Sequence, residues 1–111
     1  RMAAVGVGVG KEALTEYLVL RQLGPYVLIR LRIHTGRTHQ IRVHMSSIGC
    51  PVVGDTLYGH KTDLSERYGM MLHAMRLELT HPTTGAPLVL RAPAPHRFRQ
   101  FVENIENSGA P

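Results

Sequence analysis

Residues 35–44 read Thr35-Gly36-Arg37-Thr38-His39-Gln40-Ile41-Arg42-Val43-His44 and hold two arginines and two histidines. Gly36 predicts a sharp turn, because glycine adopts positive φ angles without steric cost. Thr38 is a typical N-cap residue, whose hydroxyl can accept a hydrogen bond from a free N–H group of the first helical turn. The segment therefore predicts a turn that leads into a helix over Thr38–Ile48.

The predicted helix has one apolar face. Ile41, Met45 and Ile48 recur at the spacing of a core-facing stripe. Gly49 follows, and glycine is the typical residue just past a helix end. Arg42 lies about 100° around the helix from Ile41. We therefore expect its guanidinium at the border of the buried face, where it needs an anionic partner.

The residues before this turn predict a β-hairpin. Leu14–Gln22 and Tyr26–His34 both alternate between apolar and polar residues, and Gly24 with Pro25 forms a turn between them. Three basic or titratable side chains share one face of the second strand: Arg30, Arg32 and His34. This row fits either a solvated sheet face or part of a surface that faces RNA, since arginines neutralise phosphates.

The remaining segments complete an α+β pattern. The glycine-punctuated stretch Ala3–Val9 predicts a weak edge strand. The other expected elements are a short extended piece at 50–53, a polar loop at 54–69 with a helical turn at 64–68, a hairpin of 71–80 with 87–91, and a helix opened by Pro95. The expected fold is α+β, with a mainly antiparallel (mixed) sheet and two or three helices.

Length and composition narrow the class of protein. The chain has 111 residues, a formal charge of +5, and eleven arginines against two lysines. Arginine suits planar, bidentate contact with phosphate, so the balance favours nucleic acid, although many small basic domains bind none. Aromatic residues make up 5% and tryptophan is absent, which argues against a platform that stacks many bases.

The cysteine count and the hydropathy of the sequence indicate the cellular compartment. Cys50 is the single cysteine, so neither an internal disulfide nor a cysteine-based zinc site can form. The sequence has no apolar run of about 18 residues. We expect one domain in a reducing, intracellular compartment, the cytoplasm first, with an organelle left open.

Further motifs carry a family resemblance. The helix is followed by Gly49-Cys50-Pro51-Val52-Val53-Gly54-Asp55-Thr56-Leu57-Tyr58-Gly59, and later by Leu72-His73-Ala74, His81-Pro82, Thr84-Gly85 and Ala92-Pro93. Together with residues 35–44, these motifs resemble the signature of RluA-type RNA pseudouridine synthases. The resemblance implies that residues 1–111 are the C-terminal part of a catalytic domain that isomerises uridine to pseudouridine in RNA, without metal or cofactor.

The nucleophile of that family is not found in this chain. Members carry a nucleophilic aspartate in an HRLD-x-x-TSG motif, whereas the two aspartates here, Asp55 and Asp63, follow no His-Arg-Leu. We therefore expect the chain alone to be inactive, and its incomplete sheet to expose an edge that favours self-association. One alternative is a non-catalytic RNA-binding or scaffolding module; another is a half that completes its site with a second chain. An HRLD-bearing segment upstream would favour the enzyme.

The resemblance also assigns roles to residues. Arg42 matches the family arginine that pairs with the nucleophilic aspartate, which this chain lacks; the alternative is a structural salt bridge to Glu16 or Glu78. From their place in the turn that leads into the helix, and not from the resemblance, three residues are expected to donate to RNA phosphate or to a loop carbonyl: Arg37, His39 and Gln40. The alternative is that they only fix the turn. The RNA itself, ribosomal or transfer, and the uridine modified stay open.

Other polar residues are expected to be structural. His34, His39 and His44 are evenly spaced, but a five-residue step turns imidazoles away from one another on a helix and on a strand alike, so no metal site is predicted. Asp55 is expected to cap the turn that it begins, with Tyr58 packed over it. Neither residue is assigned a chemical step.

Overall fold

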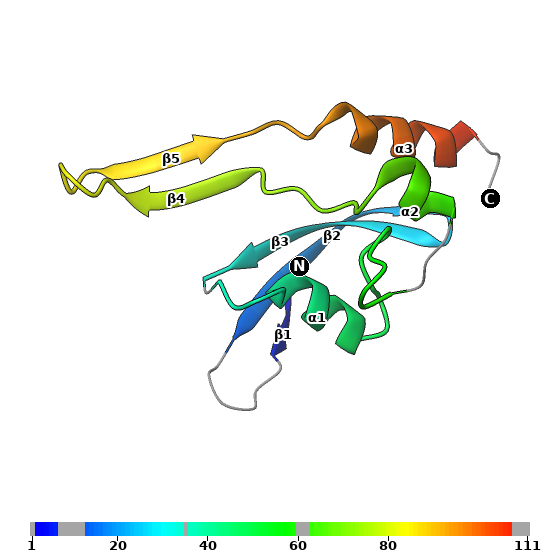
Figure 1. The fold of residues 1–111 in the computed structure, drawn as a ribbon, viewed down its shortest axis with the longest axis horizontal. Helices are drawn as coiled ribbons and strands as arrows, with labels where there is room; N and C mark the ends of the chain where they lie inside the picture. The colour runs from blue at the N-terminus through cyan, green and yellow to red at the C-terminus, as the bar shows by residue number, and fades with distance from the viewer. Residues whose placement is uncertain (1, 7–12, 35, 60–62, 108–111) are drawn as a thin grey trace.

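The computed structural model describes residues 2–6, 13–34, 36–59 and 63–107. Its first sheet is antiparallel, in the order β1 (Met2–Gly6), β2 (Leu14–Leu23) and β3 (Tyr26–Ile33). The predicted hairpin is confirmed, and Met2–Gly6 is an edge strand as expected. The rest of the predicted edge strand, after residue 6, lies outside the described residues. Figure 1 shows this sheet at the centre of the molecule.

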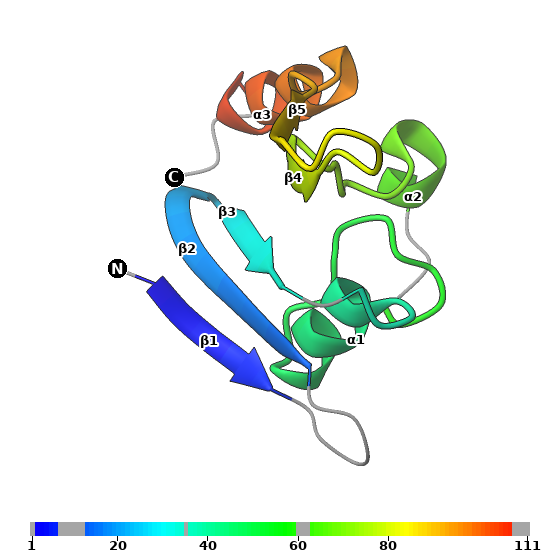
Figure 2. The ribbon, with the colours of Figure 1, turned by 90° about the vertical axis from the view of Figure 1, so that its left-hand side faces the viewer.

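Helix α1 (Gln40–Ser47) lies against one face of this sheet, close to the start of β2, as Figure 2 shows. The predicted start was wrong in two respects. His39, with φ 51°, holds the left-handed conformation expected of Gly36, and it is also the N-cap, without a side-chain hydrogen bond, in place of Thr38. A left-handed conformation is uncommon for a residue other than glycine and costs backbone energy.

The helix end was predicted correctly. Gly49 has φ 79°, and its N–H donates to the carbonyl of Ser46 at 3.0 Å. The N–H of Cys50 donates to the carbonyl of Met45 at 2.9 Å. These two bonds are a Schellman motif, which satisfies carbonyls of the last turn and directs the chain into the following loop.

The buried face of α1 differs from the predicted apolar stripe. Met45 is buried and Ile41 half-buried, but Ile48 is 42% exposed. Gln40 and His44, one turn apart, take the remaining buried positions. The reason is a polar contact with β2, described below, which an apolar periodicity cannot predict.

The second half of the chain forms a hairpin arm and two helices. The elements are α2 (Asp63–Tyr68), β4 (Arg76–Thr80), β5 (Pro87–Arg91) and α3 (His96–Asn107). Strands β4 and β5 pair antiparallel and extend away from the other elements (Figure 1). All described strand pairs are antiparallel, so the α+β class is confirmed, with the described strands divided between two sheets. None of the described helices is long and apolar enough to cross a membrane.

An aromatic cluster fastens α3 to the turn end of the β2–β3 hairpin. The ring of Phe101 meets the rings of Tyr26 and Tyr68 edge to face, at centroid distances of 5.3 and 5.1 Å. Asn104 donates to the hydroxyl of Tyr68 at 2.6 Å, which satisfies this buried polar group. This core leaves the opposite end of the sheet, where α1 lies, to a separate set of polar contacts.

A close backbone approach fixes the loop after α1. Gly54 has φ 83°, and a Cβ atom there would lie 2.0 Å from the carbonyl oxygen of Gly69. The N–H of Met71 donates to the carbonyl of Val53 at 2.8 Å beside it. Only glycine fits this position, and the contact holds the following residue, Asp55, in place against α1.

Candidate functional site around Arg42 and Asp55

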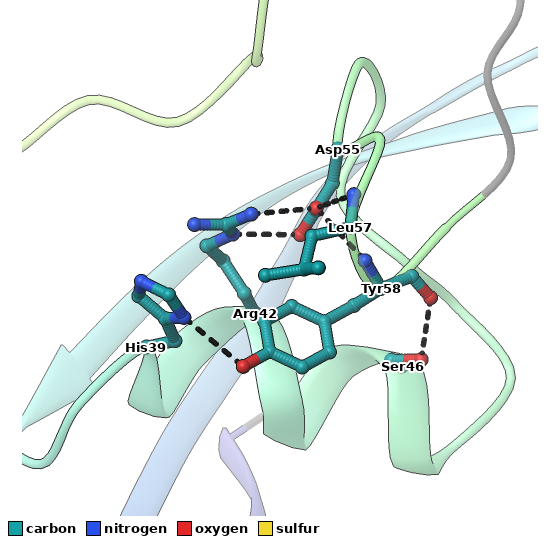
Figure 3. Close-up of polar contacts among 6 residues, drawn as sticks. All are labelled: His39, Arg42, Ser46, Asp55, Leu57 and Tyr58. Carbon is teal, nitrogen blue, oxygen red and sulfur yellow. Dashed lines mark hydrogen bonds and ion pairs between the residues drawn. The ribbon is translucent and has the colours of Figure 1, made fainter.

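Arg42 on α1 forms a bidentate ion pair with Asp55 of the following loop (Figure 3). Its Nε donates to Oδ2 and its Nη2 to Oδ1, both at 2.9 Å. The side chain of Asp55 is fully buried and that of Arg42 is 18% exposed. A guanidinium fork matches a carboxylate in this parallel geometry, which fixes orientation as well as supplying charge.

Asp55 also caps its own turn, as predicted. Its Oδ1 accepts hydrogen bonds from the backbone N–H groups of Leu57 and Tyr58, at 3.0 and 3.1 Å. The hydrogen bonds from Arg42 hold the pKa of the Asp55 carboxyl well below its usual range; burial opposes them, and the two N–H groups add to the lowering. The carboxylate therefore stays ionised.

This pair corrects the expectation that Arg42 has no anionic partner within the chain. The alternative partners considered from the sequence are wrong as well. Glu16 is hydrogen bonded to His34 at 2.9 Å, and Glu78 pairs with Arg76 at 2.6 Å. Asp55 was overlooked because its role as a turn cap accounted for its position in the sequence, although a carboxylate can accept both kinds of bond.

Tyr58 brings His39 and Arg42 together. The guanidinium carbon of Arg42 lies 5.2 Å from the centroid of the Tyr58 ring, within the range of a cation–π contact. The Tyr58 hydroxyl and Nδ1 of His39 are 3.0 Å apart, and the hydroxyl of Ser46 donates to the Tyr58 carbonyl at 2.9 Å. Figure 3 shows the Tyr58 ring beside the Arg42 side chain, with its hydroxyl directed toward His39, the N-cap of α1.

Gln40 lies inside the protein, which argues against its predicted contact with RNA. Its side chain is 5% exposed, and its Nε2 donates to the carbonyl of Leu14 at 3.0 Å and to Oγ1 of Thr15 at 3.2 Å. Its Oε1 accepts from the backbone N–H of Arg37 at 3.2 Å. The alternative role, fixing the turn, fits these contacts: Gln40 connects the turn to the first residues of β2.

Thr15 and His44 complete this polar contact between β2 and α1. Oγ1 of Thr15 lies 2.6 Å from Nδ1 of His44, and the two residues are 0% and 2% exposed. Neither was identified from the sequence as part of the site. Sequence alone gives no signal for them, because a threonine in an alternating strand and a histidine in a helix have many possible partners.

Two further predicted RNA contacts, Arg30 and Arg32, lie on the face of the sheet away from α1. Thr15 faces α1, so the next residue, Glu16, faces away from it. Glu16 pairs in register with Arg32, and Leu18 with Arg30. Because cross-strand partners share a face, both arginines lie on the side away from α1. Both are exposed, but the structure does not bring them together with Arg42.

The side of Arg42 turned away from Asp55 is available for a second anion. No residue of the described ranges accepts a hydrogen bond from its Nη1, and Figure 3 shows this nitrogen pointing away from Asp55. Arg37 and His39, in the turn before α1, are exposed. The arrangement can therefore bind a carboxylate or a phosphate beside an already paired guanidinium. Among the described residues, no group of three or more His, Cys, Asp or Glu side chains gathers as a metal site requires.

Comparisons with known proteins agree on one family. A sequence profile described as RNA pseudouridylate synthase matches residues 3–47. "Uncharacterized RNA pseudouridine synthase YlyB" of Bacillus subtilis is 40% identical over 100 residues, which cover 90% of this chain and 33% of that protein. "Ribosomal large subunit pseudouridine synthase D" of Pseudomonas aeruginosa is 41% identical over 104 residues, which cover 83% and 32%.

A solved structure extends the agreement to the fold. "Human RNA Pseudouridylate Synthase Domain Containing 1" aligns with a TM-score of 0.61 and 31% identity, over 91% of this chain and 49% of that one. Because the alignment spans about half of the solved chain, it fits the prediction that this chain is the C-terminal half of such a fold. The chain spans about a third of the length of the curated relatives named above.

Proposed function

Since this chain belongs to the RluA-type family of RNA pseudouridine synthases, we propose that its full-length protein isomerises uridine to pseudouridine in RNA. The reaction cleaves the C1′–N1 bond of the nucleotide, turns the base, and rejoins it through C5. The observation that carries the proposal is the geometry of Arg42, whose position matches the family arginine. Its guanidinium is fixed by Asp55, while Nη1 points away from that residue.

Asp55 is unsuited to be the nucleophile. Both of its oxygens accept hydrogen bonds, and its side chain is fully buried. We therefore propose that the attacking aspartate comes from outside these 111 residues, and that Arg42 pairs with it through Nη1. A guanidinium within a few ångströms favours the ionised carboxylate, lowers its pKa, and fixes its orientation for attack.

The proposed RNA contacts start at the turn before α1. Arg37 and His39 are exposed in the turn before α1, the helix that carries Arg42, and Arg37 suits a phosphate on either side of the reacting nucleotide. Arg30 and Arg32 lie on the other face of the sheet, where they would reach a different part of the RNA. The target base must leave its stack, so such backbone contacts hold the strand while the base is extruded.

The relatives also suggest which class of RNA the protein modifies. We propose ribosomal RNA as the first substrate to test and transfer RNA as the second, because one of the relatives is named a ribosomal large subunit pseudouridine synthase. The cytoplasm, where these RNAs are found, is the proposed location.

We further propose that the β4–β5 hairpin supports self-association when these 111 residues stand alone. No described strand covers either edge of this sheet. Its cross-strand pairs Leu77 with Leu90 and Leu79 with Leu88 place four leucines on one face. Leu77 and Leu90 are 55% and 49% exposed. Sedimentation velocity should show association that increases with concentration; a strictly monomeric chain would overturn this proposal.

The proposed activity can be tested on RNA that lacks the modification. Purified full-length protein is incubated with ribosomal and transfer RNA from a strain deleted for its gene. Carbodiimide treatment and primer extension then locate pseudouridines. We expect new stops at one or a few uridines. RNA that is bound without any new stop would favour the non-catalytic RNA-binding module, and would overturn the proposal.

A further inference from the structure

We propose that Asp55 is a positioning residue, which holds the guanidinium of Arg42 in the single orientation that catalysis uses. The inference rests on the proposed function, in which Arg42 pairs with a nucleophilic aspartate. Asp55 itself touches neither substrate nor nucleophile in this scheme. It acts through the two parallel hydrogen bonds, both 2.9 Å long, that it accepts from Nε and Nη2 of Arg42.

Asp55 is held rigidly by the backbone around it. Its Oδ1 is fixed by the backbone N–H groups of Leu57 and Tyr58, at 3.0 and 3.1 Å. The residue before it, Gly54, is in such close contact with Gly69 that no side chain fits. The carboxylate therefore has a fixed position before Arg42 binds to it.

The bidentate bond fixes the orientation of the Arg42 guanidinium. A guanidinium is planar, so two parallel bonds to one carboxylate fix its plane as well as its position. Tyr58 restricts the remaining freedom, because its ring lies 5.2 Å from the guanidinium carbon. Nη1 is then held in one direction, away from Asp55 (Figure 3). An arginine without this support would have to lose the freedom of several rotatable bonds during the reaction.

The Arg42–Asp55 pair fits a role in positioning better than a role in stability. A buried ion pair contributes little net stability, because desolvation offsets the attraction and apolar residues of the same size often serve as well. Here one partner is fully buried and the other is 18% exposed, with one edge of its fork unused by any described residue. This asymmetry is typical of an ion pair that presents a guanidinium nitrogen to a ligand. It fits less well an ion pair that only fills the interior.

A double-mutant cycle on the full-length protein tests the proposal. The single-turnover rate of pseudouridine formation is measured for wild type, Asp55→Asn, Arg42→Lys and the double variant. Asp55→Asn should lower the rate about 100-fold or more, the size expected when a catalytic group is misplaced by about 1 Å. In the Arg42→Lys background the same change should cost about 3-fold or less, because an ammonium has no fork for Asp55 to orient. A merely structural Asp55 would cost the same factor in both backgrounds, which would overturn the proposal.

Two further readouts keep the outcomes distinct. In wild type, the Nε–H proton of Arg42 should exchange slowly with solvent by NMR, and Asp55→Asn should abolish that protection; unchanged protection also overturns the proposal. Glu103→Gln, which removes an exposed carboxylate from α3, is the charge-matched control and should keep the wild-type rate. A wild type without product overturns the proposed function and this inference together. An active wild type with unaffected Asp55→Asn overturns only the inference.

If Asp55→Asn fails to fold, Tyr58→Leu takes its place in the cycle. This variant removes the ring beside the guanidinium but keeps the backbone N–H bonds to Asp55. Its loss of rate should be present with Arg42 and absent with lysine at that position. Equal losses in the two backgrounds would overturn the proposal.

Discussion

Arg42 and Asp55, 13 residues apart in the chain, meet in two parallel hydrogen bonds of 2.9 Å that join α1 to the loop after it. The pair lies at the end of the sheet opposite the aromatic core, beside the turn that carries Arg37 and His39. Its charge is largely compensated, yet no residue of the described ranges accepts a hydrogen bond from Nη1 of Arg42. The expected effects of substitutions depend on this arrangement.

Arg42→Met should destabilise the protein. If Arg42 had no partner within the chain, the same change would be neutral or stabilising, since an unpaired guanidinium at the border of the core only loses hydration. With the pair formed, methionine leaves the buried carboxylate of Asp55 uncompensated, which is costly. Urea unfolding should therefore show a clearly lower midpoint, and Asp55→Asn in the same protein should recover part of it. An unchanged midpoint for Arg42→Met would mean that the pair does not form in solution.

The stability of the protein should depend on pH through Asp55. Its pKa in the folded state is held below the ordinary aspartate value of about 3.9, so the unfolded state binds more protons in this range. The stabilisation is complete above pH of about 4 and is lost as the pH falls toward the folded-state pKa. The free energy of unfolding of Asp55→Asn should accordingly fall less steeply between about pH 4 and pH 2 than that of wild type. Glu103→Gln is the control, and an identical slope in Asp55→Asn would contradict the ionised pair.

Thr15→Val should cost about 1 to 3 kcal/mol of stability, the range for buried polar groups left without a partner. Valine has the same shape but cannot bond to Gln40 or His44, which contact Oγ1 of Thr15 at 3.2 and 2.6 Å. Thr56→Val, at an exposed position of the loop after α1, is the matched control and should change little. A Thr15→Val variant as stable as the control would show that the contact between β2 and α1 is dispensable.

Local patterns predicted the elements of this fold well. Alternation identified the β2–β3 hairpin, and Gly49 marked the end of α1, because both depend on the backbone preferences of neighbouring residues. The start of α1 was not predictable in the same way. A left-handed His39 is uncommon, and it is observed where its side chain also contacts Tyr58, 19 residues later in the chain. Whether such contacts offset the cost of the left-handed conformation depends on residues far from His39 in the sequence, which a local pattern does not include.

The candidate site shows the same division. Arg42 was identified from its motif, and Asp55 from its turn, but their pairing depends on how the loop folds back onto α1. Gln40 was expected to face RNA because it lies in the turn that leads into the helix, yet its amide donates to Thr15 inside the protein. Periodicity separates apolar from polar positions, whereas it cannot tell which polar side chains find partners within the protein.

The 111-residue chain by itself should form no pseudouridine. No described residue is expected to replace the missing nucleophile, since Asp55 is buried and both of its oxygens accept hydrogen bonds from Arg42. RNA labelled with tritium at C5 of uridine should release none above background when incubated with the purified chain. Release that grows with chain concentration would mean that a residue of this chain attacks the nucleotide.

The most direct test is the single-turnover rate of the full-length protein with arginine and with lysine at position 42. Lysine keeps the charge but loses the planar fork. We expect the wild type to convert its target uridine and Arg42→Lys to be slower by about 100-fold or more, with RNA affinity nearly unchanged because Arg37 is intact. A full-length protein in which lysine serves as well as arginine would contradict the catalytic role of Arg42.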